Sequence, residues 1–154
     1  MYKKALALVV LVMLATSVAP AVAATASDNG GSNIEINRIV VHPSGPDLNF
    51  TVYYNTNLFT HVFSMFFGAK TIQPSISNTF QNFSNVTVTR IDLDDHIAEV
   101  HASNQTYLND AGLYVYDNDT AFPARIEKVE IRDTSEGPMI VENTDSLPFF
   151  TAKP

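Results

Sequence analysis

"LNFTVYYNTNLFTHVFSMFFGAK", residues 48–70, decides the fold, because its hydrophobic period changes halfway along. Over residues 48–55 apolar and polar side chains alternate, which predicts a β-strand with one face on the core. From Asn57, a suitable N-cap, apolar residues recur at helical spacing until Gly68, which predicts an α-helix between them. A strand that leads directly into a helix sets the pattern for the rest of the chain.

The predicted helix is apolar around most of its circumference, which leaves two interpretations open. A domain without disulfides needs a large apolar element under its sheet, so the first interpretation is that this helix forms the core. The second is that it lines a groove for an apolar ligand or a partner, since aromatic and methionine side chains serve both purposes. The candidate groove residues are Phe59, Phe63, Met65, Phe66 and Phe67.

The surrounding sequence predicts hairpins on both sides of the helical region. Residues 34–42 are expected to form a strand that either has a bulge around Asn37–Arg38 or is buried on both faces toward its end. This strand should pair with residues 48–55 across a Pro- and Gly-containing turn. A second short helix, with Pro74 in its first turn, is expected to follow the first and to turn Ile76, Phe80 and Phe83 inward; the alternative is one kinked helix from residue 58 to about 82.

Further strands are predicted at 85–93, 97–103, 112–119, 124–133 and 138–143. In the strand at 112–119, Tyr114 and Tyr116 are expected to form an aromatic pair on the outer face. The fold class is therefore α+β: an antiparallel sheet of about five to seven strands, curled around one apolar helical segment, in the order β-β-α(α)-β-β-β-β.

The N-terminus has the pattern of a secretory signal peptide. Lys3 and Lys4 precede an apolar run over residues 5–15, and small residues follow at the spacing that signal peptidase recognises. We expect residues 1–24 to be the signal peptide, with cleavage after Ala23 or Ala24. Residues 25–33 should then be a flexible polar leader, and residues 34–150 should form one α+β domain. A retained membrane anchor is the alternative, but the run is shorter than the roughly 20 residues that span a bilayer.

Composition narrows the class of function. Loss of Lys3 and Lys4 changes the formal charge from −7 to −9, and an acidic chain without a basic cluster argues against nucleic acid and anionic membranes as partners. There is no cysteine, which excludes disulfides, thiol nucleophiles and zinc–thiolate sites. The expected location is extracellular or at the cell surface.

Asn-x-Ser/Thr triplets are the most frequent motif. They occur at Asn49, Asn82, Asn85, Asn104 and Asn118, each without an intervening proline. Their positions on a polar strand face, in loops and at the helix-to-strand junction predict exposure to solvent. We interpret them as candidate N-glycosylation sites.

Catalytic and metal-binding signals are weak. Carboxylates gather at two predicted loops and are candidate cation ligands: Asp92, Asp94, Asp95, Asp117 and Asp119. The spacing does not match an EF-hand, and Asp is common in turns for local hydrogen bonding alone. No spacing nominates a catalytic residue, and no cofactor is predicted.

The sequence therefore favours a non-enzymatic exported domain that acts by contact, as a structural or interaction protein of the cell surface or envelope. Protein partners or self-association fit this hypothesis. Nucleic acid does not fit it as a partner, and neither does a membrane once the signal peptide is cleaved. The alternative is a binding module that holds a small apolar ligand, peptide or glycan in the helix–sheet groove. A secreted hydrolase or metal-dependent enzyme built around Asp92, Asp94 and His96 is a third hypothesis.

Overall fold

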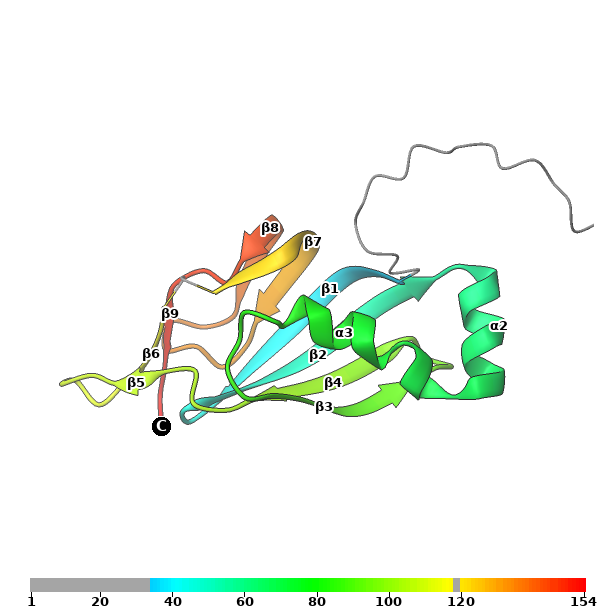
Figure 1. Ribbon diagram of the computed structural model, residues 1–154. Helices are drawn as coiled ribbons and strands as arrows, with labels where there is room; N and C mark the ends of the chain where they lie inside the picture. Colours follow the sequence, from blue (N-terminus) through cyan, green and yellow to red (C-terminus); the bar gives the residue numbers. More distant parts are fainter. Residues whose placement is uncertain (1–33, 118–119) are drawn as a thin grey trace, which may run out of the picture. The chain divides into compact units, whose positions relative to one another are not determined.

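The computed structural model describes residues 34–117 and 120–154, and it confirms the α+β class (Figure 1). The signal peptide, the leader, Asn118 and Asp119 lie outside the described residues. The elements in chain order are β1 (Ile34–Ser44), β2 (Asp47–Thr56), α2 (Leu58–Phe67), the 3-10 turn η1 (Ala69–Thr71), α3 (Gln73–Thr79), β3 (Val86–Asp92), β4 (Ile97–Ala102), β5 (Tyr107–Leu108), β6 (Tyr114–Tyr116), β7 (Ala121–Ile131), β8 (Met139–Ser146) and β9 (Phe150–Ala152).

The larger sheet has six strands in the order β3-β4-β2-β1-β7-β8. Both predicted hairpins are present, β1 with β2 and β3 with β4, and the first has its register shift between Ile36 and Arg38, where a bulge was expected. One pair departs from the antiparallel pattern: β1 and β7 run parallel, so the sheet is mixed. This parallel pair joins the N-terminal hairpin to a strand about ninety residues later in the chain.

The core lies on the face of the sheet that α3 covers (Figure 1). Pro74 lies in the first turn of α3, as expected, because that turn does not need its N–H for helical hydrogen bonds. Phe80 is fully buried and its ring lies 4.8 Å from that of Phe50 on β2. Phe83 and Phe122 complete the aromatic cluster around them. The inward orientation predicted for the second helix is confirmed.

The smaller sheet has three strands in the order β5-β6-β9, and it corrects one prediction. The expected outer-face pair of tyrosines is wrong, because Tyr116 is buried and stacks on Phe150 with ring centroids 4.4 Å apart. The Tyr116 hydroxyl donates to the Gly45 carbonyl at 2.6 Å, in the β1–β2 turn. Tyr116 thus attaches the smaller sheet to one end of the larger one.

The interpretation of α2 as the core is also wrong. The core cluster contains no residue of α2, and the only buried residue of that helix is Ser64. The helix follows β2 and lies at the end of the larger sheet, away from the Gly45 turn (Figure 1). Because α3 and Phe83 already fill the apolar face of the sheet, α2 has no core to enter.

Candidate functional site

The side chains of α2 are arranged with the polar ones toward the domain and the apolar ones toward solvent. Ser64 is buried and Thr60 and His61 are half-buried, whereas seven large apolar side chains are 43–83 % exposed. At 100° per residue the exposed side chains cover an arc of roughly 200°, with the most exposed, Phe66, opposite Ser64. The exposed residues are Leu58, Phe59, Val62, Phe63, Met65, Phe66 and Phe67.

The ends of α2 are defined by specific caps. The Asn57 side chain accepts a hydrogen bond from the Thr60 N–H at 2.8 Å, which confirms the predicted N-cap. Gly68 has φ 84°, a left-handed conformation that a residue with a Cβ adopts at a cost, and its N–H donates to the Ser64 carbonyl. The helix therefore begins and ends where its sequence specifies.

The contacts of α2 with the domain are polar and aromatic. The His61 ring stacks on His96 of the β3–β4 turn with centroids 5.1 Å apart, and Tyr54 meets His96 edge-on at 5.6 Å. The Ser64 hydroxyl donates to the Thr60 carbonyl at 2.5 Å, within the helix. Sequence analysis missed this histidine pair, although the only polar residues of the helix share one face and mark the side that contacts the domain.

The phenylalanines of α2 contact one another in a row on the exposed surface. The rings of Phe59 and Phe63 are stacked with centroids 6.1 Å apart, and those of Phe63 and Phe67 lie 4.4 Å apart. Exposed large apolar residues are common singly, but a contiguous patch of this size marks an interaction site in soluble proteins. We call the seven exposed apolar residues of α2 the α2 patch.

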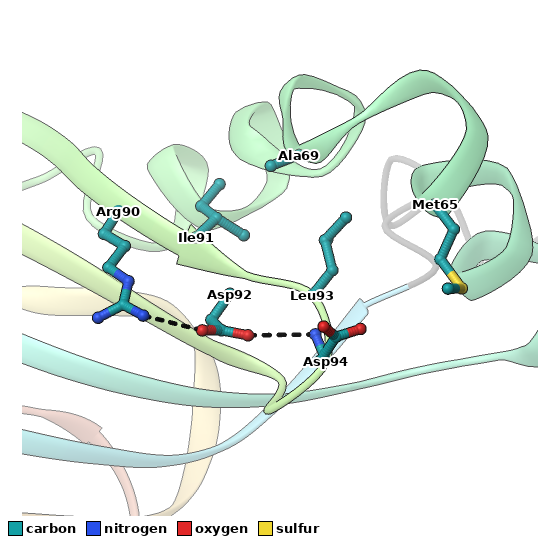
Figure 2. Close-up of a pocket in the computed structure, with 7 residues that line it drawn as sticks. All are labelled: Met65, Ala69, Arg90, Ile91, Asp92, Leu93 and Asp94. Carbon is teal, nitrogen blue, oxygen red and sulfur yellow. Dashed lines mark hydrogen bonds and ion pairs between the residues drawn. The ribbon is translucent and has the colours of Figure 1, made fainter.

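A groove of about 500 Å³ lies between the α2–η1 region and the end of β3 (Figure 2). Of the five candidate groove residues only Met65 lines it, and the four phenylalanines belong to the exposed patch. The lining residues are Met65, Ala69, Arg90, Ile91, Asp92, Leu93 and Asp94. The groove thus combines apolar walls with one cation and two carboxylates.

The Asp92 carboxylate in this groove is occupied by its own turn. Oδ2 accepts from Arg90 at 2.9 Å and Oδ1 accepts from the Asp94 backbone N–H at 3.2 Å (Figure 2). Oδ1 also accepts from the Asp95 backbone N–H at 3.1 Å. The Asp95 N–H is the largest cause that holds the pKa of Asp92 below its usual value, and the Asp94 N–H and Arg90 add to it. This is the local turn bonding typical of Asp.

The other described candidates for cation ligands do not form a metal site with Asp92. Asp94 and Asp95 are exposed beside Asp92, and Asp117 is exposed after β6, in a different part of the sheet system. Within residues 34–117 and 120–154, no three His, Asp or Glu side chains are placed to hold a metal ion. His96 stacks on His61 and is not directed at a carboxylate cluster.

The four described sequon asparagines are exposed, as predicted. Three lie toward the Gly45 end of the larger sheet: Asn49 is near the start of β2, Asn85 precedes β3, and Asn104 follows β4 next to Asp47. Asn85 and Asn104 have φ 49° and 55°, a left-handed conformation that asparagine tolerates better than most residues. Asn82 differs, since its Nδ2, the atom that a glycan would modify, donates to the Ala121 carbonyl at 2.7 Å.

The face of the larger sheet opposite α3 carries paired charges. Glu130 on β7 accepts from Arg132 at 2.8 Å and from Arg38 on β1 at 2.6 Å, and the bond from Arg132, followed by that from Arg38, lowers the pKa of Glu130. Arg38 also lies over the Tyr53 ring, 5.1 Å from its centroid. The charges on this face pair with one another, whereas the α2 patch contains no charged residue.

Within the described ranges, no helix combines the length and hydropathy needed to cross a bilayer. No family model, no curated protein and no solved structure matches the chain.

Proposed function

We propose that this chain is an exported, N-glycosylated, non-enzymatic domain of the cell surface or envelope that acts by contact through the α2 patch. The observation that carries the proposal is the orientation of α2, whose apolar residues face solvent while its polar residues face the domain. An arrangement that exposes four phenylalanines is unfavourable in water and becomes favourable when a partner covers them. The signal-like N-terminus and the absence of a catalytic pattern in the sequence support the same proposal.

The positions of the sequons support this assignment of surfaces. Asn49, Asn85 and Asn104 lie toward the end of the larger sheet that is remote from α2. Glycans there would cover one end of the domain and leave the α2 patch bare. Surfaces that bind partners need to remain free of such bulky groups.

The test is the distribution of the protein in cells that produce it. Phe66→Lys places a charge in the most exposed position of the patch, and we expect it to move the protein from the envelope fraction into the medium. Ile140→Lys, a matched change of an exposed apolar side chain on β8, should leave the distribution unchanged. Equal retention of the wild type and both variants in the envelope would show that the α2 patch is not the contact surface.

The glycans are tested by peptide mass before and after enzymatic release. We expect modification at Asn85 and not at Asn82, because the Asn82 amide nitrogen already contacts the Ala121 carbonyl. Asn85→Gly should remove one glycan and keep the left-handed backbone that this position requires. An unmodified Asn85 in protein that carries other glycans would contradict this part of the proposal.

A second candidate function, a binding module, rests on the groove beside Met65. Its apolar wall and its Arg90–Asp92 pair suit a small ligand with both apolar and polar parts. Native mass spectrometry of the purified protein should then show a bound molecule that Leu93→Ala releases. A mass equal to that of the chain and its glycans alone would remove this candidate.

A further inference from the structure

We infer that the partner of the α2 patch is a second copy of this chain, which pairs α2 against α2 in a two-fold symmetric dimer. This inference rests on the proposed function and names the partner of the same surface. Three properties of the patch favour a second copy over other occupants: its area, its lack of charge and its position beside the acidic β3–β4 turn.

The area of the patch fits a protein interface. Large side chains present about 150–250 Å² each. With 43–83 % exposure, the seven residues leave roughly 800 Å² of apolar surface. This exceeds the patches of about 300–600 Å² found on typical monomers, and it matches the roughly 800 Å² per partner of a stable interface.

The charge distribution favours self-pairing through the α2 patch. The chain carries a net formal charge of −7, so two copies repel each other over most approaches. Residues 58–67 contain no Asp, Glu, Lys or Arg, so α2 can face its own copy without opposing like charges. A two-fold interface uses the same patch twice and needs only this self-complementarity.

The acidic turn beside α2 disfavours an anionic membrane as the occupant. Asp94 and Asp95 are exposed on the turn that follows β3, and Asp94 shares a groove with Met65 of α2. Anionic headgroups that reached α2 would meet these carboxylates. A neutral bilayer is the remaining membrane occupant, and the experiment below separates it from the dimer.

Phe66 provides a specific test, because it lies at the centre of the exposed arc and the chain contains no cysteine. In Phe66→Cys the only thiols are the two that the dimer would place in the same interface. Under a mild oxidant at micromolar protein, we expect a covalent dimer on a non-reducing gel. Ile140→Cys, whose parent side chain is 55 % exposed on β8, should stay largely monomeric in parallel. Equal cross-linking of the two variants would overturn the inference.

The mass in solution provides a second readout on the full chain, purified after export. Light scattering should give twice the mass of the cleaved, glycosylated chain for the wild type and its single mass for Phe66→Lys, with the same far-ultraviolet circular dichroism. Lysine in the last turn of a helix is compatible with the helix dipole, so loss of the dimer would not reflect loss of the helix.

The remaining outcomes distinguish this inference from the proposed function. A wild type that is monomeric at every concentration tested overturns the dimer. If that monomer still binds phosphatidylcholine vesicles, and Phe66→Lys abolishes the binding, a neutral membrane is the partner and the contact function of α2 stands. If the wild type is monomeric and Phe66→Lys changes neither vesicle binding nor retention in the envelope, both proposals fail.

Discussion

His61 of α2 stacks on His96 of the β3–β4 turn, with ring centroids 5.1 Å apart and an angle of 28° between the planes. The pair joins two segments 35 positions apart in the numbering, and Tyr54 of β2 supports His96 from its edge. Since the apolar residues of α2 point away from the domain, this polar aromatic contact holds the helix in place. The orientation of the α2 patch depends on it.

His61→Ala should loosen α2 without unfolding the domain. An aromatic pair contributes about 0.5–1.5 kcal/mol, so we expect a loss of the same size in the free energy of unfolding. Hydrogen exchange of the amides of residues 58–67 should become faster, while that of β1 and β2 stays the same. His42→Ala, which removes an exposed histidine near Asp133, is the control and should leave exchange in α2 unchanged. Equal exchange rates in His61→Ala and the wild type would show that the stack does not anchor the helix.

Phe80→Ala and Phe66→Ala should differ strongly in their effect on stability. Phe80 is fully buried against Phe50 and Phe122, and truncation of a buried phenylalanine costs about 3–5 kcal/mol. Phe66 is 83 % exposed, so its truncation should cost less than about 0.5 kcal/mol when unfolding in urea is followed at a concentration below that of any dimer. If Phe80→Ala does not fold, Phe80→Leu gives a smaller loss in the same direction. Similar losses for Phe80 and Phe66 would mean that α2 is part of the core after all.

Asp92→Asn should change the stability of the domain at neutral pH and not in acid. The pKa of Asp92 is lowered from 3.8 by the Asp95 N–H, the Asp94 N–H and Arg90, so the carboxylate stabilises the fold above that pH. This contribution is lost as the pH falls through the lower pKa of the folded state. The difference in urea midpoint between the wild type and Asp92→Asn should therefore be constant from about pH 7 to 5 and shrink progressively as the pH falls below 3.8.

The control for Asp92 is Asp145→Asn on β8, because the Asp145 carboxylate has no ion pair among residues 34–117 and 120–154. Its difference from the wild type should be small at every pH. A difference for Asp92→Asn that persists unchanged in acid would mean that the charge of Asp92 is not its cause, since the carboxyl group is then protonated and asparagine keeps the Oδ1 acceptor.

Tyr116→Phe should weaken the attachment of the smaller sheet. It removes the hydrogen bond to the Gly45 carbonyl, which costs about 1–2 kcal/mol in the free energy of unfolding at pH 7. Burial, followed by the charge of Asp47, raises the pKa of Tyr116 to about 12. Because a raised tyrosine pKa favours the folded state below pH 10, this stabilisation is lost as the pH rises through about 12.

Absorbance at 295 nm follows the ionisation of Tyr116 directly. Tyr54 has a pKa raised to about 12 by burial and by Asp92, so the step near pH 12 belongs to two tyrosines in the wild type. Tyr116→Phe should halve that step. If the absorbance step near pH 12 is as large in Tyr116→Phe as in the wild type, Tyr116 does not ionise near pH 12.

Local sequence signals predicted most of the fold because they act over a few residues. The alternation of Leu48, Phe50, Val52 and Tyr54 places the core face of β2, and all four are buried. Asn57 and Gly68 mark the ends of α2 through their own backbone preferences. The bulge near Arg38 follows from a phase change in the alternation, which needs no information from distant residues.

The same local signals could not predict long-range contacts. The parallel pairing of β1 with β7 joins Val41 to Ile131, and no local pattern identifies such a partner. Val115 and Tyr116 are both buried, and the stacking partner of Tyr116, Phe150 of β9, lies 34 positions later in the chain.

The sequence by itself determined that α2 is a helix, where it ends and that most of its surface is apolar. Only the tertiary structure decided which side of that helix is exposed. A helix with apolar residues around most of its circumference has no periodic signal that separates a core face from an outer face. The sheet has one apolar face of limited area, and α3 with Phe80 and Phe83 occupies it. The α2 helix consequently lies at the end of the sheet, where His61 stacks on His96, and its phenylalanines are exposed.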